Sequence, residues 1–397
     1  MNKLAIDGGA PVRTKPFPQW PIFDELEERL LLEVLHSGKW GGTGRIKLPE
    51  FEANFATFHD AQYAVTVANG TVAIIIALMA AGLQPGDEVI MPPYTFVATA
   101  TAALMFGAIP IFVDVEADTL LLDPDKVEAA ITPRTKAIIA VHIGGLPANL
   151  TKLNEIARKH NLRVIEDSAQ AVGAQWEGTG VGAIGDCGTF SFQSSKNINS
   201  GEGGIILTNN KELADQAWSL ANVGRARQGE WYQHVHVGWN LRMTEFQAAI
   251  LLGQMSRLEH QLITRERNGK LLTEFLGEVD GISLLRRDAR VTRHAYHLYM
   301  FKIAAELSSQ EIKLEIIRKL NAEGIPVYPG YVSLNQNQAI IDESYKWTGE
   351  KRIYSCPIAE RACEQEILWL HQNVLLGEEA DMYDIVKSIR KVMQSYS

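Results

Sequence analysis

A single lysine stands in the stretch SFQSSKNINSGEGG, residues 191–204, among small polar residues and ahead of three glycines. Most lysines lie on helix faces among other charges, so Lys196 is placed unusually. A partly desolvated lysine has a lowered pKa and can attack carbonyl compounds as a neutral amine. An ordinary lysine in a surface loop is the alternative, and Lys196 alone does not decide between the two.

Two other predicted strand ends carry groups that suit the same chemistry. Asp167 follows the apolar run LRVIE. A buried carboxylate there needs a partner, so it indicates a cationic ligand or a catalytic role as readily as a cap for the next turn. Gly70 and Thr71 follow YAVTV and Asn69 at the start of a helical pattern, which fits either a phosphate site or a plain N-cap. An amine, an acid and a phosphate cradle together are what pyridoxal 5′-phosphate requires.

Two further patterns suggest other ligands. Gly180, Gly182 and Gly185 match the G-x-G-x-x-G pattern of dinucleotide binding. That motif needs a strand before it and a helix after it, whereas here it follows the polar QWEGT and precedes a predicted strand, so a nicotinamide-dependent oxidoreductase is disfavoured. His234 and His236 are two residues apart with no third ligand nearby, so we predict that they line a pocket and bind no metal.

The elements that must position these residues follow a regular order. Between about residues 60 and 210, short runs that are apolar throughout alternate with helical patterns. Uniformly apolar runs are typical of strands buried on both faces, and repeated β/α units predict a mostly parallel, doubly wound α/β sheet. In such sheets ligands bind at the carboxyl ends of the strands, where Gly70, Asp167 and Ser191 are expected.

The rest of the chain predicts two smaller parts. Residues 1–20, with three prolines, read as an extended N-terminal arm before a large cofactor-binding domain over 21–258. A long helical pattern from Met243 to about Leu276 leads into a smaller C-terminal α+β domain over 259–397. In that domain HAYHLYMFKI predicts a strand, and SSQEIKLEIIRKLNAEGI predicts a capped helix.

Composition limits the possible partners and location. The net charge of −9 argues against nucleic acid and anionic membranes, which favour basic proteins. Three cysteines without a C-x-x-C spacing give neither a disulfide framework nor a zinc site, so we expect a reducing cytoplasm. No signal peptide or membrane span is readable in the sequence.

Five motifs in order connect these observations to a known family: NGT, PPYTFVAT, VIEDSAQAVGA, GTFSFQSSKNINSGEGG and GWNLRMTEFQAAIL. The chain resembles the keto-sugar and aminocyclitol aminotransferases (DegT/StrS-like) of the PLP-dependent transferase fold type I. The resemblance extends from about residue 10 to the segment LHQNVLLG at 370–377.

The resemblance implies a role for each matching residue. Lys196 would bind the cofactor covalently and later move a proton, and Asp167 would pair with the pyridine nitrogen. Gln170 would contact the ring hydroxyl, and Phe96 would stack on the ring. The phosphate would be bound by four residues, the last from the neighbouring subunit of a homodimer with shared active sites: Gly70, Thr71, Ser191 and Asn240.

The implied reaction moves an amino group from L-glutamate or L-glutamine to a keto-cyclitol or keto-sugar, in secondary-metabolite (antibiotic) or surface-sugar biosynthesis. One family branch carries histidine in place of the lysine and dehydrates sugars, and Lys196 argues against that branch. A non-catalytic pyridoxal-phosphate protein is disfavoured by the retained Lys196 and Asp167.

The most similar branch includes scyllo-inosose aminotransferases and 3-amino-5-hydroxybenzoate synthases. The benzoate synthases carry histidine where this chain has Gln170, which favours amino transfer over a dehydrating, aromatising enzyme. A nucleotide-linked keto-sugar aminotransferase is the other alternative, because three arginines could bind a diphosphate: Arg225, Arg227 and Arg242. The candidate substrate contacts are Trp231, Tyr232, His234 and Arg242.

Overall fold

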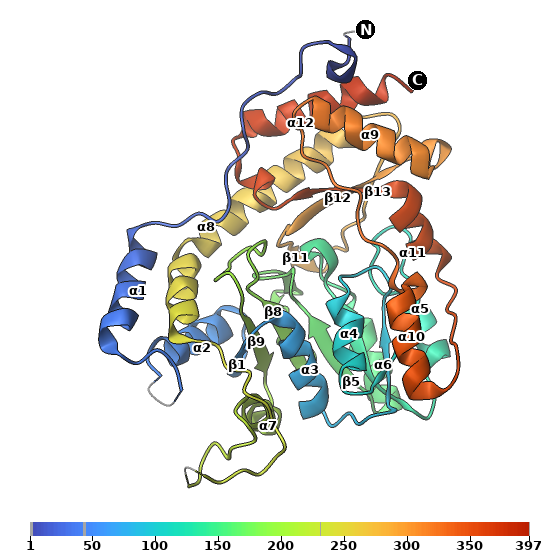
Figure 1. The fold of residues 1–397 in the computed structure, drawn as a ribbon. Coiled ribbons are helices and arrows are strands. Elements are labelled where there is room, and N and C mark those ends of the chain that lie inside the picture. The colour runs from blue at the N-terminus through green and yellow to red at the C-terminus, as the bar shows by residue number, and fades with distance from the viewer. Residues whose placement is uncertain (1–2, 43–44, 231, 397) are drawn as a thin grey trace.

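A seven-stranded sheet lies at the centre of the larger part of the molecule (Figure 1). The computed structural model describes residues 3–42, 45–230 and 232–396. The strand order is β1-β9-β8-β5-β4-β2-β3, and only β9 runs antiparallel to its neighbours. The predicted α/β fold with a mostly parallel sheet is therefore confirmed. The strands are β1 (Tyr63–Val67), β2 (Glu88–Met91), β3 (Ile109–Phe112), β4 (Thr135–Val141), β5 (Arg163–Asp167), β8 (Cys187–Ser191) and β9 (Gly204–Thr208).

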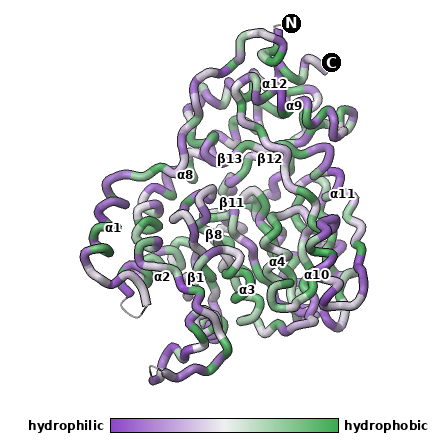
Figure 2. Tube along the Cα trace, viewed as in Figure 1, coloured by the Kyte–Doolittle hydropathy of each residue, from purple (hydrophilic) through white to green (hydrophobic). Residues whose placement is uncertain are grey.

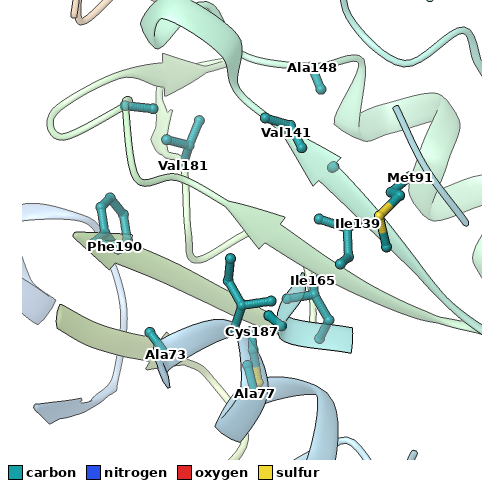
Figure 3. Close-up of a cluster of buried hydrophobic side chains, with 14 of the residues drawn as sticks. Ala73, Ala77, Met91, Ile139, Val141, Ala148, Ile165, Val181, Cys187 and Phe190 are labelled. Atoms are coloured by element: carbon teal, nitrogen blue, oxygen red, sulfur yellow. The ribbon is translucent and has the colours of Figure 1, made fainter. Parts of the chain in front are cut away.

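Helices cover this sheet because parallel strands must be joined by crossovers. Helix α3 packs on β5, β8 and β9 with α4 and α7 beside it, and α6 packs on β4 and β5. In Figure 3, Ala73 and Ala77 of α3 lie with Ile165 and Cys187 of the strands in one buried cluster. Figure 2 shows hydrophobic residues concentrated in α3, α4 and the central strands. The helices are α3 (Gly70–Ala80), α4 (Ala98–Leu104), α5 (Pro124–Val127), α6 (Leu150–His160) and α7 (Lys211–Ala221).

A second hydrophobic cluster surrounds a three-stranded antiparallel sheet of order β10-β12-β13. Helices α9 and α12 cover it at the top of Figure 1. Helices α10 and α11 contribute instead to the first cluster through Ile340 and Ala359. The bounds are β10 (Ile282–Leu284), β12 (Leu298–Ile303), β13 (Ile367–His371), α9 (Gln310–Ala322), α10 (Gln338–Thr348), α11 (Pro357–Arg361) and α12 (Glu379–Met393). A third small sheet pairs β11 (Val291–Arg293) with β6 (Gln175–Trp176) and β7 (Thr179–Gly180).

Helix α8 (Glu245–Leu276) runs through both parts of the molecule (Figure 1). Its start is fixed by a capping box, in which Thr244 accepts from the Gln247 backbone and the Gln247 side chain accepts from Thr244. Its first half supplies Leu251 and Leu258 to the first cluster, and its last turns supply Leu272 and Leu276 to the second. Helices α1 (Glu25–Ser37) and α2 (Lys47–Phe58) pack against α8.

The N-terminal arm is held along the smaller sheet's helices. The Arg13 guanidinium is buried and donates to Asp381 at 2.7 Å and to Asp384 at 3.0 Å. Glu323 accepts from the Ala5 backbone at 2.8 Å and from the Val12 backbone at 3.0 Å. These contacts anchor the N-terminal segment to the C-terminal helices, and Ala5–Asp7 within it forms a short 3-10 helix.

The segment after α7 projects from the lower edge of the molecule (Figure 1). It carries several exposed apolar side chains: Tyr232, Val235, Val237 and Trp239. Within the described part of the chain, no helix combines the length and the apolar character needed to cross a membrane.

Candidate active site

The candidate residues Gly70, Asp167 and Ser191 meet at one edge of the large sheet. Asp167 ends β5 and lies opposite Thr189 of the neighbouring β8. Ser191 ends β8 and lies opposite Gly204 of β9, which in turn lies opposite Val67 at the end of β1. The sheet register therefore brings together three strand ends that are far apart in the sequence.

Lys196 lies in the loop between β8 and β9, beside this edge. Desolvation lowers the pKa of its amino group to about 8, and the nearby negative charge of Asp167 opposes part of that shift. The residue as a whole is only partly buried, so the amino group is desolvated while the loop itself reaches the surface. A lysine in this state is a neutral nucleophile at a much lower pH than an ordinary lysine.

Asp167 is buried and its carboxylate is held from two sides. The Thr99 hydroxyl of α4 donates to Oδ2 at 2.7 Å, and the Ala169 backbone donates to Oδ1 at 3.3 Å. The Thr95 hydroxyl lies 2.9 Å from that of Thr99 and extends the network. These contacts fix the orientation of a carboxylate that has no basic side chain in a salt bridge among the described residues, so it suits a cationic ligand.

Gln170 is held by groups from two distant segments. Its Oε1 accepts from the Gly144 backbone at 2.7 Å, and its Nε2 donates to the Tyr331 hydroxyl at 2.6 Å. Burial and the charge of Asp167 raise the pKa of Tyr331, so this hydroxyl keeps its proton. Tyr331 thus belongs to the site, although the sequence around it contains no motif that predicts this.

The start of α3 forms a close-packed cradle over β8. The Asn69 side chain accepts from the Val72 backbone, which leaves the Gly70 and Thr71 amides as the free first N–H groups of the helix. A Cβ added to Gly70 would lie 2.6 Å from Cβ of Ser191, so only glycine fits there. The Ser191 hydroxyl accepts from the Gln193 backbone at 3.3 Å and keeps its own hydrogen for donation.

Phe96 is exposed although its sequence neighbours Tyr94 and Thr95 are buried. Its side chain is 55% exposed, against 0% for Tyr94 and 2% for Thr95. Phe96 lies three residues before Thr99, whose hydroxyl bonds to Asp167. An exposed ring, a reactive amine, a fixed carboxylate and a helix N-terminus together fit a ligand with an aromatic ring, a carbonyl and a phosphate. Pyridoxal 5′-phosphate has these three groups, so the residues present fit the cofactor predicted from the sequence.

The other candidates lie on the segment after α7. Asn240 forms an isolated bridge with Asn222, and the next residue, Leu241, accepts from the Ala68 backbone at 2.8 Å. This places Asn240 and Arg242 beside the end of β1. Burial and the charge of Arg225 lower the pKa of Arg242.

Tyr232 and His234 lie further out on the same segment. Their rings contact each other at 5.0 Å, both side chains are exposed, and His234 Nδ1 lies 2.8 Å from the Val223 carbonyl. They do not join the cluster around Lys196 within this subunit. Trp231 lies outside the described residues.

The glycine pattern at 180–185 wraps around a carboxylate of the protein itself. The backbone N–H groups of Gly182, Ile184 and Gly185 donate to Glu166 at 2.6–2.9 Å. His142 Nδ1 accepts from the Ala148 backbone, so its Nε2 carries the hydrogen and donates to Glu166 at 3.0 Å. The pattern therefore forms an internal anion nest under β5.

A further network connects Lys196 to the strand β12. Asn197 donates through Nδ2 to the Ala295 carbonyl at 2.8 Å, so its Oδ1 accepts from His297 Nδ1 at 3.1 Å. The Ala295 backbone in turn donates to Gly145, next to the residue that binds Gln170. These partners were missed because they belong to a segment about 100 residues downstream of Lys196.

The chain is similar to known aminotransferases over almost its whole length. The DegT/DnrJ/EryC1/StrS aminotransferase family matches residues 21–390. The chain is 38% identical over 419 residues to L-glutamine:2-deoxy-scyllo-inosose aminotransferase of Streptomyces kanamyceticus, covering 99% of this chain and 97% of the relative.

Two solved structures share the fold over almost the whole chain. One is the crystal structure of 3-amino-5-hydroxybenzoic acid synthase, with a TM-score of 0.89, 32% identity, and coverage of 96% of this chain and 100% of the other. The second is NtdA from Bacillus subtilis with bound cofactor PMP, with a TM-score of 0.82, 31% identity, and coverage of 93% and 82% respectively.

Proposed function

The chain belongs to the DegT/DnrJ/EryC1/StrS aminotransferase family, and from this premise we propose that it moves the amino group of L-glutamine or L-glutamate to a keto-cyclitol or keto-sugar. It is an aminotransferase, and its cofactor is pyridoxal 5′-phosphate. The observation that carries the assignment of site residues is the meeting of Lys196, Asp167 and the Gly70 cradle at one sheet edge.

Each residue of the site has a defined task in this proposal. When bound, the cofactor supplies an electron sink that stabilises negative charge on the substrate carbon. Lys196 would hold it covalently and then, as a free amine, take and return the proton at that carbon. Asp167, oriented by Thr99, would keep a proton on the ring nitrogen.

The remaining residues would bind and orient the group. The Gly70 and Thr71 amides and the Ser191 hydroxyl would donate to the phosphate. Phe96 would stack on one face of the ring. The Gln170 amide, which donates to the Tyr331 hydroxyl in this structure, would donate to the ring hydroxyl of the cofactor instead.

The choice of L-glutamine and a keto-cyclitol is supported by the relative from Streptomyces kanamyceticus, whose name states both substrates. The 3-amino-5-hydroxybenzoate synthase alternative is supported by a sequence relative that is 35% identical over 374 residues and by the structural likeness. Gln170 disfavours it, because an amide donor here replaces the histidine of those synthases. The proposed pathway is accordingly the biosynthesis of an antibiotic or of a surface sugar.

Mixing the holoenzyme with one amino donor and no acceptor tests the reaction. L-glutamine is expected to remove the absorbance of the lysine-bound cofactor and to raise that of pyridoxamine phosphate. Addition of 2-deoxy-scyllo-inosose should restore the first spectrum, and a panel of free and nucleotide-linked keto-sugars ranks the acceptors. Lys196→Ala is the control and should show neither change. If L-glutamine and L-glutamate both leave the wild-type spectrum unchanged, the proposed donors are wrong.

We also propose that the enzyme is a homodimer in which Asn240 reaches the phosphate of the neighbouring subunit. The exposed apolar side chains of the projecting segment, among them Val237 at 93% exposure, support a partner surface there. Tyr232, His234 and Arg242 on the same segment would then contact substrate across the interface.

The cytoplasm is the proposed location. All three thiols are free and buried, at Cys187, Cys356 and Cys363, and burial raises the pKa of each to about 12. Such thiols suit a reducing compartment.

A further inference from the structure

Two polar aromatic side chains, those of Tyr328 and His371, have hydrogen-bonding atoms without a partner among the described residues. The Tyr328 side chain is 42% exposed, and His371 at the end of β13 is half-buried. Within the residues that the structure describes, neither the Tyr328 hydroxyl nor either ring nitrogen of His371 forms a hydrogen bond. These atoms are therefore available to a ligand.

The backbone fixes the two side chains against each other. Tyr328 and Trp369 exchange two backbone hydrogen bonds of 3.1 Å, which ties the segment before Tyr331 to β13. The rings of Tyr328 and His371 meet edge to face with centroids 4.4 Å apart. A pair held in this way needs little ordering when a ligand binds.

The pair is connected to the candidate active site by two chains of contacts. His371 lies opposite Leu298 in the register of β12 and β13, and the preceding His297 bonds to Asn197, the neighbour of Lys196. Burial, and after it the nearby groups Lys196, His371 and Arg265, lower the pKa of His297.

The second chain of contacts runs through β13. Trp369, two residues before His371 and so on the same strand face, packs edge to face on Tyr331 at 4.7 Å. Tyr331 in turn bonds to Gln170. We call the four aromatic side chains the wall: Tyr328, Tyr331, Trp369 and His371. Its contacts lead to Gln170 and, through His297, to the neighbour of Lys196.

The chemistry of this wall selects for uncharged ligands. Burial lowers the pKa of His371, so its imidazole is neutral near pH 7, with one donor and one acceptor nitrogen. The Tyr328 hydroxyl can donate and accept. A diphosphate would need cations, and none of the four wall residues carries one, whereas ring hydroxyl groups match both side chains.

We propose that Tyr328 and His371 form the acceptor subsite and bind the hydroxyl groups of an uncharged polyhydroxy ring. The inference rests on the proposed aminotransferase function, and it names the substrate class as a free cyclitol or sugar without a nucleotide. The two residues touch the acceptor only, so they should not contribute to the reaction with the amino donor.

The proposed role in acceptor binding can be tested by measuring the amino-donor and acceptor half-reactions separately. Tyr328→Phe and His371→Phe keep the aromatic contact and remove the hydrogen-bonding atoms. Each is expected to raise the KM for 2-deoxy-scyllo-inosose roughly three- to tenfold, the effect of one uncharged hydrogen bond. The rate of the spectral change with L-glutamine alone should stay within about twofold of wild type. His260→Ala, an exposed histidine on α8, is the matched control and should change neither half-reaction.

Calorimetry on the holoenzyme gives a readout that does not need turnover. Scyllo-inositol, the alcohol of scyllo-inosose, is expected to bind wild type and to bind each variant more weakly by the same factor. Thymidine diphosphate glucose should compete poorly.

Three results would overturn the subsite: an unchanged acceptor KM in both variants, an equal loss in the L-glutamine half-reaction, or no inositol binding by wild type. Tight binding of the nucleotide sugar would overturn the uncharged class. A wild-type enzyme that ignores both amino donors refutes the proposed function instead, while the calorimetry still tests the subsite.

Discussion

The reactivity of Lys196 depends on its protonation state, and the site sets that state. Below its pKa of about 8 the amino group is an ammonium without a lone pair, and above it the group is a nucleophile. We therefore expect apoenzyme to bind pyridoxal 5′-phosphate covalently at a rate that rises with pH and levels off above about 8. Stopped-flow absorbance measures this rate. A rate still rising steeply between pH 9 and 10.5 would show an ordinary lysine pKa and contradict the prediction.

Thr99 is predicted to act through Asp167. Thr99→Val keeps the shape of the side chain but removes the 2.7 Å hydrogen bond to the carboxylate. A hydrogen bond to a charged group contributes about 1.5–3 kcal/mol, so kcat should fall roughly tenfold or more. The cofactor dissociation constant, read by fluorescence, should rise in parallel. Thr101→Val on the same helix is the control, and equal losses in both variants would assign the effect to packing of α4.

Some residues of the candidate site could be predicted from the sequence, and others could not. Lys196, Asp167, Gly70 and Ser191 follow predicted strands, and parallel strands must end at a common edge, so their meeting was predictable. Thr99, Tyr331 and His297 have no such signal, because each enters the site through a helix or loop whose position depends on tertiary packing. The sequence predicted which groups could react and left open which groups orient them.

At the scale of elements, the loop at 180–185 illustrates how context decides the meaning of a motif. Its three N–H groups and His142 bind Glu166, whose neighbour Asp167 faces the opposite side of β5. The hydrogen bonds to Glu166 therefore hold β5 in place at the residue next to Asp167, the candidate catalytic carboxylate.

Glu166→Gln should destabilise the protein by about 2–4 kcal/mol, because an amide cannot accept from all four donors. Urea unfolding at pH 7 measures this change. Burial alone would raise the pKa of Glu166, but the hydrogen bonds and the charge of His142 outweigh it and lower the pKa. The stabilisation is therefore present above pH 4.5 and lost as pH falls through the lower folded-state value. The variant should accordingly lose part of the acid sensitivity of wild type. Glu155→Gln, exposed on α6, should match wild type in both measurements.

Element boundaries were mostly readable from the sequence because caps and apolar runs are local. The predicted strand YAVTV is β1, and the helical pattern from Met243 to Leu276 is α8, which begins at Glu245. The division of the chain at residue 258 stays a prediction, since α8 passes through that point without a break. Helix α10 shows why: its Ile340 packs in the cluster of the large sheet, although in sequence the helix lies between β12 and β13 of the small sheet.

For the whole molecule, the projecting segment is the feature that a single chain does not explain. Val237 is 93% exposed, and Val237→Asp should weaken the proposed dimer by placing a charge in the interface. Sedimentation should give twice the 44.0 kDa chain mass for wild type and a shift toward one chain mass for the variant at low concentration. Ile353→Asp, 85% exposed outside this segment, is the control and should leave the mass unchanged. A wild-type protein that sediments as one chain would refute the dimer.

The long helix α8 is shared by the two hydrophobic clusters of the molecule. At 32 residues it extends about 48 Å, and its two ends lie in different hydrophobic clusters. Neither cluster can be cut away without exposing the half of the helix that it shelters. The two parts are therefore expected to fold as one unit, and the small part is not expected to be stable as a separate module.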